Sequence, residues 1–117
     1  MKKLIPLFLL CVSTSIFAKD KPGYSIAEIN ILNQEGYQKE LWPKIKKLVD
    51  VAGGEVIIGG GKVEGIVGVP KVPDKITVIK FNKVQSAKDF YASEQYQSLK
   101  PLADKYVKVR LYIVEGE

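Results

Sequence analysis

Alternating apolar and polar residues predict three clear β-strands, over residues 23–32, 76–81 and 107–115. Successive side chains of a strand point to opposite faces, so each face can be assigned from the sequence. In the first strand one face suits packing under helices and carries Ser25, Ala27, Ile29 and Ile31. The opposite face carries Tyr24, Ile26, Glu28 and Asn30. A shorter strand is expected over residues 55–58, running into three glycines at which the chain can bend or bulge.

Helical periodicity predicts a first amphipathic helix after the first strand. Asn33 is a good N-cap, and apolar residues then recur at spacings of three and four until Gly53 and Gly54. Pro43 lies inside this segment. Because proline removes a backbone donor and crowds the preceding turn, we expect Pro43 to kink or divide the helix.

A second helical region is predicted after residue 85. Ser86 is expected to open it, with Asp89 three residues later as a box-like capping partner. Ser93 is expected to cap a further short helix, which Pro101 closes or bends. Between residues 58 and 76, residues 62–69 are a candidate for a second extended segment.

The resulting order, β-α-β-β-α-β, predicts an α+β fold of the ferredoxin-like kind, in which a four-stranded antiparallel sheet carries two helices on one face. The other face includes hydrophobic side chains such as Ile26. A second copy packing sheet against sheet is the simplest cover for it. We therefore predict a homodimer of the α+β barrel type.

The amino terminus has the pattern of a secretory signal peptide. Lys2 and Lys3 precede an apolar run over residues 4–12, and a stretch of small residues ends at Ala18. The run is about half of the roughly 20 residues that span a membrane. We therefore expect cleavage after Ala18, export to the periplasm or the medium without stable membrane insertion, and one domain over residues 19–117. The single cysteine, Cys11, would leave with the signal.

Charge argues against a nucleic-acid partner. The chain carries 18 basic and 13 acidic residues, and two of the basic ones belong to the predicted signal peptide. The remaining lysines are scattered among acidic neighbours, a pattern typical of a solvated surface rather than a polyanion-binding patch.

The absence of histidine narrows the possible chemistry. It excludes the usual Ser-His-Asp and Cys-His mechanisms and histidine-ligated metals. Neither a metal nor a cofactor is predicted. Glu28 is the candidate general base, since a carboxylate in apolar surroundings can have a raised pKa. The alternative is that Glu28 pairs with a lysine or lies at a wet dimer rim.

Several polar residues are candidates for ligand binding. Tyr37, Tyr91 and Tyr96 could line a cleft between helices and sheet, although aromatic residues at helical spacing are more often core residues with a tethered hydroxyl. Glu64 lies in a glycine-rich loop, where the alternative is a solvated charge. Tyr24 and Asn30 complete the candidate set, on the same strand face as Glu28.

Seven short pieces of the sequence resemble a known family. They are Gly23-Tyr24-x-Ile26-Ala27, Glu35-Gly36-Tyr37, Gly53-Gly54, Gly60-Gly61, the strand 76–81, Tyr91-x-Ser93-x-x-Tyr96-Gln97 and Val114-Glu115-Gly116. In this order they resemble the family called domain of unknown function 1330, within the dimeric α+β barrel superfamily. The resemblance covers essentially all of residues 19–117. It implies the fold and the dimer, and supplies no established reaction.

The chain departs from that family where the family often carries charge. Asn33, Gly59, Val67 and Ala103 stand where the resemblance implies an aspartate, an arginine, a glutamate and an arginine. If those groups line a cleft in the family, this protein either lacks that ligand or binds a less polar one.

Three functions are therefore open on sequence alone. The first is a binding protein for a small, weakly polar ligand held in the sheet–helix cleft. The second is a cofactor-free enzyme for proton transfer, isomerisation or oxygenation, with Glu28 as base and a tyrosine as electrophilic partner. The third is a non-catalytic structural or interaction module.

Overall fold

The structure, a computed structural model, describes residues 20–68 and 70–117. The predicted signal peptide and Cys11 lie outside the described residues. The strands are β1 (Gly23–Ile31), β2 (Glu55–Gly59), β3 (Lys75–Phe81) and β4 (Val107–Glu115). The helical elements are α2 (Gln34–Gly36), the π-helical turn η1 (Tyr37–Leu41), α3 (Trp42–Val51), α4 (Val84–Ala92), α5 (Glu94–Gln97) and α6 (Lys100–Tyr106).

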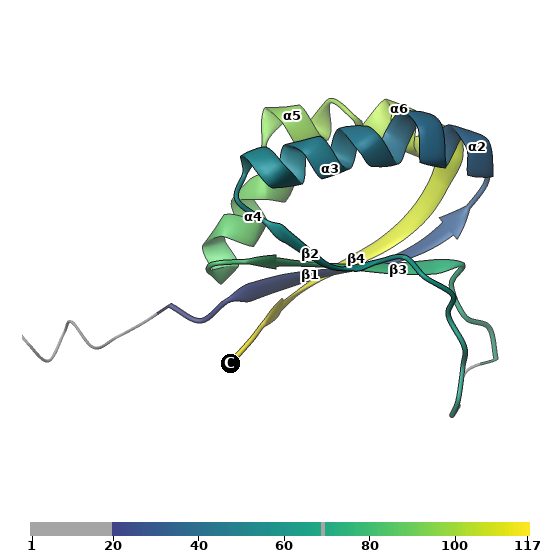
Figure 1. The fold of residues 1–117 in the computed structure, drawn as a ribbon, viewed down its shortest axis with the longest axis horizontal. Helices are drawn as coiled ribbons and strands as arrows, with labels where there is room; N and C mark the ends of the chain where they lie inside the picture. Colours follow the sequence, from purple (N-terminus) through teal and green to yellow (C-terminus); the bar gives the residue numbers. More distant parts are fainter. Residues whose placement is uncertain (1–19, 69) are drawn as a thin grey trace, which may run out of the picture.

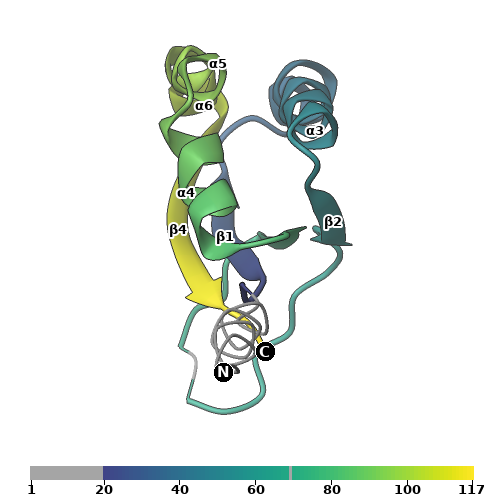
Figure 2. The same cartoon turned by 90° about the vertical axis from the view of Figure 1, so that its left-hand side faces the viewer.

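The four strands form one antiparallel sheet in the order β2-β3-β1-β4, with the helices on one face (Figure 1). β1 and β3 are central, and β2 and β4 are the edges. Figure 2 shows α3 and the α5–α6 region side by side above the sheet. The predicted ferredoxin-like α+β fold is confirmed.

Most predicted strands are confirmed, but the extended segment between β2 and β3 is wrong. Residues 60–68 contain no strand. β2 remains an edge strand with only β3 as a neighbour, so this segment adds no fifth strand to the sheet. At the glycines, β2 ends at Gly59 and Gly60 takes a positive φ of 96°, and a separate bulge lies earlier, between Val56 and Ile58.

The first helical region begins as predicted, and it accommodates Pro43 by a change from α-helix to a π-helical turn before this residue. Asn33 accepts a 2.9 Å hydrogen bond from the Gly36 amide and caps α2. The Trp42 amide then bonds to the Tyr37 carbonyl, five residues back, in the π-helical turn η1. Pro43 follows in the first turn of α3, where a missing amide hydrogen costs little.

The second helical region differs from the prediction at two residues. α4 begins at Val84 after Lys83, so Ser86 lies inside the helix and is not its cap, and Asp89 instead accepts a hydrogen bond from Gln85. Ser93 does cap α5, since its hydroxyl accepts from the Tyr96 amide. Pro101 lies in the first turn of α6 and so opens a helix rather than closing one.

Two apolar clusters fill the space between sheet and helices. One contains Val49, Ile79, Phe81, Ala87 and Phe90, and the other contains Ile29, Tyr37, Leu41 and Val107. The opposite face of the sheet, called the open face below, has no helix over it among the described residues, and Ile58, Tyr112 and Val114 are exposed there.

Candidate functional site

A small cavity lies between the sheet and the helices, with a volume of about 60 Å³. Its lining is almost entirely apolar and includes three tyrosines: Ala27, Ile29, Tyr37, Leu41, Trp42, Ile45, Thr77, Ile79, Tyr91, Tyr96, Ala103, Val107, Val109 and Leu111. A groove of about 590 Å³ adjoins it along β4 and α6 and shares Tyr91, Tyr96, Ala103, Val107, Val109 and Leu111. The rest of its lining is polar and consists of Gln97, Lys100, Asp104 and Lys108. The cavity therefore continues into a wider groove at one edge of the sheet.

The sheet leaves this space because its central row carries small side chains. Ala27 of β1 pairs with Thr77 of β3 on one side and with Leu111 of β4 on the other. All three face the helices by strand alternation. On the helical side, Ala103 of α6 reaches the same space. Short side chains in opposite walls leave the interior unfilled at this point.

The hydroxyl of Thr77 is the unusual group in this cavity. Thr77 is only 3% exposed, and its Oγ1 has no hydrogen-bond partner among the described residues. An unsatisfied buried hydroxyl costs about 1–3 kcal/mol relative to a paired one. Such a group, lining an otherwise apolar cavity, offers one hydrogen bond to whatever enters.

The three tyrosines present neutral phenols to the same region. Tyr91 donates a 2.8 Å hydrogen bond to the buried Ser25 hydroxyl, and its ring meets Tyr96 edge to face at 4.8 Å. Burial raises the pKa of Tyr91 to about 12, against the opposing effect of the Ser25 hydrogen bond. Burial also raises the pKa of Tyr96.

Tyr37 is the phenol associated with Thr77. Burial raises the pKa of Tyr37, and the Thr77 hydroxyl lies close enough to offset part of that rise without forming a hydrogen bond of good geometry. A ligand oxygen between the two groups could bond to both of them.

The raised pKa of Tyr91 predicts a specific alkaline instability. Tyr91 holds its proton more tightly in the folded chain, with a pKa of about 12 against its ordinary value of 10.0, so its contribution is present below pH 10 and is lost as pH rises towards 12. At about 1.4 kcal/mol per pKa unit, the loss is on the order of 3 kcal/mol. Denaturant titrations across this pH range should show a shallower decline for Tyr91→Phe than for the unsubstituted chain. A Val51→Ala control, at a residue that is 81% exposed on α3, should keep the full slope, and equal slopes for all three proteins would contradict a buried Tyr91 phenol.

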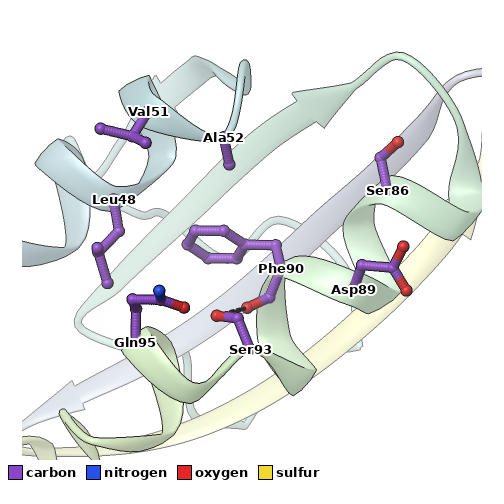
Figure 3. A pocket seen from close by; sticks show the side chains of 8 residues that line it. All are labelled: Leu48, Val51, Ala52, Ser86, Asp89, Phe90, Ser93 and Gln95. Carbon is purple, nitrogen blue, oxygen red and sulfur yellow. Dashed lines mark hydrogen bonds between the residues drawn. The ribbon is translucent and has the colours of Figure 1, made fainter.

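A second surface cleft, of about 400 Å³, lies between α3 and the α4–α5 region (Figure 3). Two of its polar side chains already have partners in the helices. The Ser93 hydroxyl donates to the Phe90 carbonyl at 2.7 Å, and Asp89 accepts from Gln85 at 2.9 Å. Although this cleft is larger than the cavity, it presents no buried unpaired polar group among the described residues, and we favour the cavity as the site.

The structure brings together part of the predicted ligand-binding set. Tyr37, Tyr91 and Tyr96 meet around the cavity. Tyr24 and Asn30 lie on the open face, by strand alternation, and Glu64 lies in the connection between β2 and β3.

Glu28, the candidate base, also lies on the open face, across the sheet from the cavity. Its carboxylate is 4.0 Å from the guanidinium of Arg110, which in turn lies 5.8 Å from the centre of the Tyr112 ring. The ion-pair partner is thus an arginine of the neighbouring strand. The structure does not bring Glu28 together with the tyrosines of the cavity, which the enzyme hypothesis required.

Sequence reasoning missed Thr77, Ala103, Val109 and Leu111. Thr77 could have been found, since it is a polar residue that alternates with the apolar Ile79 and Phe81 on the helix-facing side of β3. Ala103 was singled out only as a missing family charge, and it lines the cavity. A small neutral residue at this position is consistent with a weakly polar ligand.

Neither a metal cluster nor a membrane-spanning helix is found in residues 20–68 and 70–117. This part of the chain holds no group of three or more His, Cys, Asp or Glu side chains placed to bind a metal ion. None of its helices is both long and apolar enough to cross a membrane.

Comparison with known proteins gives a family and a fold. Residues 22–117 match the family model described as domain of unknown function (DUF1330). No curated protein matches the chain. A crystal structure of a protein of unknown function from Rhodopseudomonas palustris is similar, with a TM-score of 0.67 and 12% identity over 99% of this chain and 95% of that one. A conserved protein from Methanosarcina mazei has a TM-score of 0.51 and 16% identity over 83% and 94%. At these identities the structural likeness shows the fold alone.

Proposed function

The chain belongs to the DUF1330 family, and we propose that it binds a small, largely apolar ligand in its sheet–helix cavity without chemically altering it. The ligand would carry one hydroxyl or carbonyl group at its buried end. The family supplies no reaction from which to choose. The proposal therefore rests on the site itself.

The unpaired Thr77 hydroxyl is the observation that carries the proposal. Buried polar groups are nearly always hydrogen-bonded, and those that are not require an explanation. A ligand oxygen at this point would satisfy the hydroxyl. The apolar lining would supply most of the binding free energy, since burying apolar surface contributes about 25 cal/mol per Å².

The volumes of the cavity and of the adjoining groove indicate the shape of the ligand. Typical ligand sites have volumes of about 300–1,000 Å³. The cavity of about 60 Å³ is smaller than this, whereas the adjoining groove of about 590 Å³ lies within the range. We infer an elongated ligand whose polar end lies beside Thr77 and whose apolar body lies along β4.

Substituting Thr77 by valine tests the proposal, because it should change stability and affinity in opposite directions. Valine keeps the shape and removes the unpaired hydroxyl, so the ligand-free protein should gain about 1 kcal/mol of unfolding free energy. Octanol is a suitable probe, since it is an elongated apolar molecule with a terminal hydroxyl. Its affinity should fall roughly tenfold, because a lost hydrogen bond of about 1.4 kcal/mol corresponds to that factor.

Thr77→Ser is the matched control, since it keeps the hydroxyl and should retain most of the octanol affinity. Denaturant unfolding gives the stability, and titration calorimetry gives the affinity. Unchanged octanol binding by Thr77→Val, or loss of stability in that variant, would count against a ligand at Thr77.

We also propose that the protein is a homodimer in which two open faces pack together. Support comes from the half-buried Ile26 and Val78, which pair across β1 and β3 at the centre of this face, and from the exposed Tyr112 and Val114 beside them. Glu28 and Arg110 lie on the same face 4.0 Å apart, so these opposite charges would enter the interface already paired within each copy.

Export is proposed on the pattern of residues 1–18 alone. A charged start, an apolar run of about half the membrane-spanning length and a small-residue stretch favour a cleaved signal peptide. The protein would then act in the periplasm or the medium.

A further inference from the structure

The connection between β2 and β3 carries two exposed apolar residues, and hydrogen bonds hold its two ends, called the base below. The apolar residues, called the tip below, are Ile66 and Val67, which are 84% and 82% exposed. At the base, the Lys75 ammonium donates a 3.0 Å hydrogen bond to the Gly60 carbonyl, and Asp74 accepts a 2.8 Å bond from the Ile31 amide. Residues 61–68 lie on the side of the sheet away from the helices (Figures 1 and 2). The tip therefore points towards the side on which a second sheet would pack.

The ligand groove is incomplete in one chain. Val109 and Leu111 belong to the helix-facing side of β4, yet they are 45% and 38% exposed. Although α4 and α6 contact β4, these two apolar side chains remain in contact with solvent at the mouth of the cavity. Another apolar segment would have to cover it.

A two-fold axis parallel to the strands brings the tip to this groove. With the sheet order β2-β3-β1-β4, such an axis places β2 of one copy opposite β4 of the other. Because the axis is parallel to the strands, the rotation leaves the position of each residue along the strand direction unchanged. Ile29 pairs with both Lys75, where the connection rejoins the sheet, and Val109. The connection of one copy therefore lies level with Val109 of the second copy.

Length and charge both suit this contact. The residues from Gly61 to Ile66 can extend to about 20 Å, whereas packed sheets lie about 10 Å apart, so the tip can pass the edge of the second sheet. Glu64 precedes the tip, is exposed and lies 4.0 Å from Lys62 of its own chain, and Lys108 is exposed beside Val109 at the groove. The two opposite charges would meet where the connection crosses β4.

We propose that Ile66 and Val67 of one copy lie against Val109 and Leu111 of the other and cover the mouth of the ligand cavity. Glu64 pairs with Lys108 of the second copy. This inference rests on the dimer proposed above. Residues of both chains would then form each ligand site, which goes beyond the existence of the dimer.

Disulfide trapping tests the contact. In a Cys11→Ser background, which leaves no other cysteine, Val67→Cys and Val109→Cys are combined in one chain. Mild oxidation should convert most of this protein to a covalent dimer on a non-reducing gel. Each single cysteine variant is a matched control and should remain at monomer mass, as should Val51→Cys combined with Val109→Cys, since Val51 is exposed on α3.

Light scattering and octanol titration on the same proteins separate the possible failures. A non-covalent dimer that binds octanol but gives no Val67–Val109 cross-link would overturn this inference and leave the proposed function intact. A monomer by light scattering would overturn the inference and the dimer together. Octanol affinity should also fall several-fold in Ile66→Ser/Val67→Ser, and an unchanged affinity there would contradict a role of the tip at the site.

Discussion

Replacing Phe81 by alanine is expected to lower the free energy of unfolding by about 3–5 kcal/mol, the range for a fully buried phenylalanine. Phe81 is 1% exposed, and its ring centre lies 5.5 Å from that of Phe90. It belongs to the cluster that joins β3 to α3 and α4, so truncation would leave a cavity bounded on several sides. Because domains are stable by only about 5–15 kcal/mol, this variant should lie close to its unfolding threshold.

Guanidinium unfolding at one fixed protein concentration measures this loss, since the stability of a dimer depends on concentration. Phe81→Leu is the control, because it keeps most of the apolar volume and should cost less than about 1.5 kcal/mol. A loss below about 1 kcal/mol for Phe81→Ala would mean that this core is not packed as described.

Replacing Val78 by glutamate is expected to convert the dimer into a monomer. Val78 lies on the open face of the central strand β3, paired with Ile26. A glutamate from each copy would be buried without a partner at the interface, at a cost of about 3–5 kcal/mol. That corresponds to a dimer dissociation constant weaker by roughly a hundredfold or more.

Val51→Glu is the matched control, because it makes the same chemical change at a residue that is 81% exposed on α3. Multi-angle light scattering at micromolar concentration should give a dimer for the unsubstituted chain and for Val51→Glu, and a monomer for Val78→Glu. A dimer that survives Val78→Glu would show that the copies meet through another surface.

The fold could be predicted from the sequence because local signals and tertiary packing agree over most of the chain. Alternation in β1, β3 and β4 fixes both the strands and their helix-facing sides, and Asn33 and Ser93 act as the caps that their positions suggest. In these segments one residue pattern satisfies both the backbone and the core.

Predictions failed where a residue type suits two roles. Serine favours a cap but is also tolerated within a helix, so Ser86 could not reveal that α4 begins at Val84. Proline ends helices and also starts them, and Pro101 takes the second role. The π-helical turn before Pro43 depends on how the whole segment packs on the sheet, which no local pattern specifies.

The candidate site was only partly predictable, because a cavity forms where facing side chains are too small to fill the space between them. The tyrosines were visible at helical spacing, whereas the cavity also needs Ala27, Thr77 and Ala103 to be small and to lie opposite one another. That coincidence joins β1, β3 and α6, which are distant in sequence. Glu28 was assigned to the correct strand face, but the sequence could not show Arg110 opposite it.

Intermolecular nuclear Overhauser effects between octanol and the protein test most directly whether the sheet–helix cavity and its groove bind the ligand. We expect cross-peaks from octanol to the side chains of Tyr91, Tyr96 and Leu111, which line both spaces. Cross-peaks confined to Tyr112 and Val114 on the open face, or none at saturating octanol, would contradict binding there.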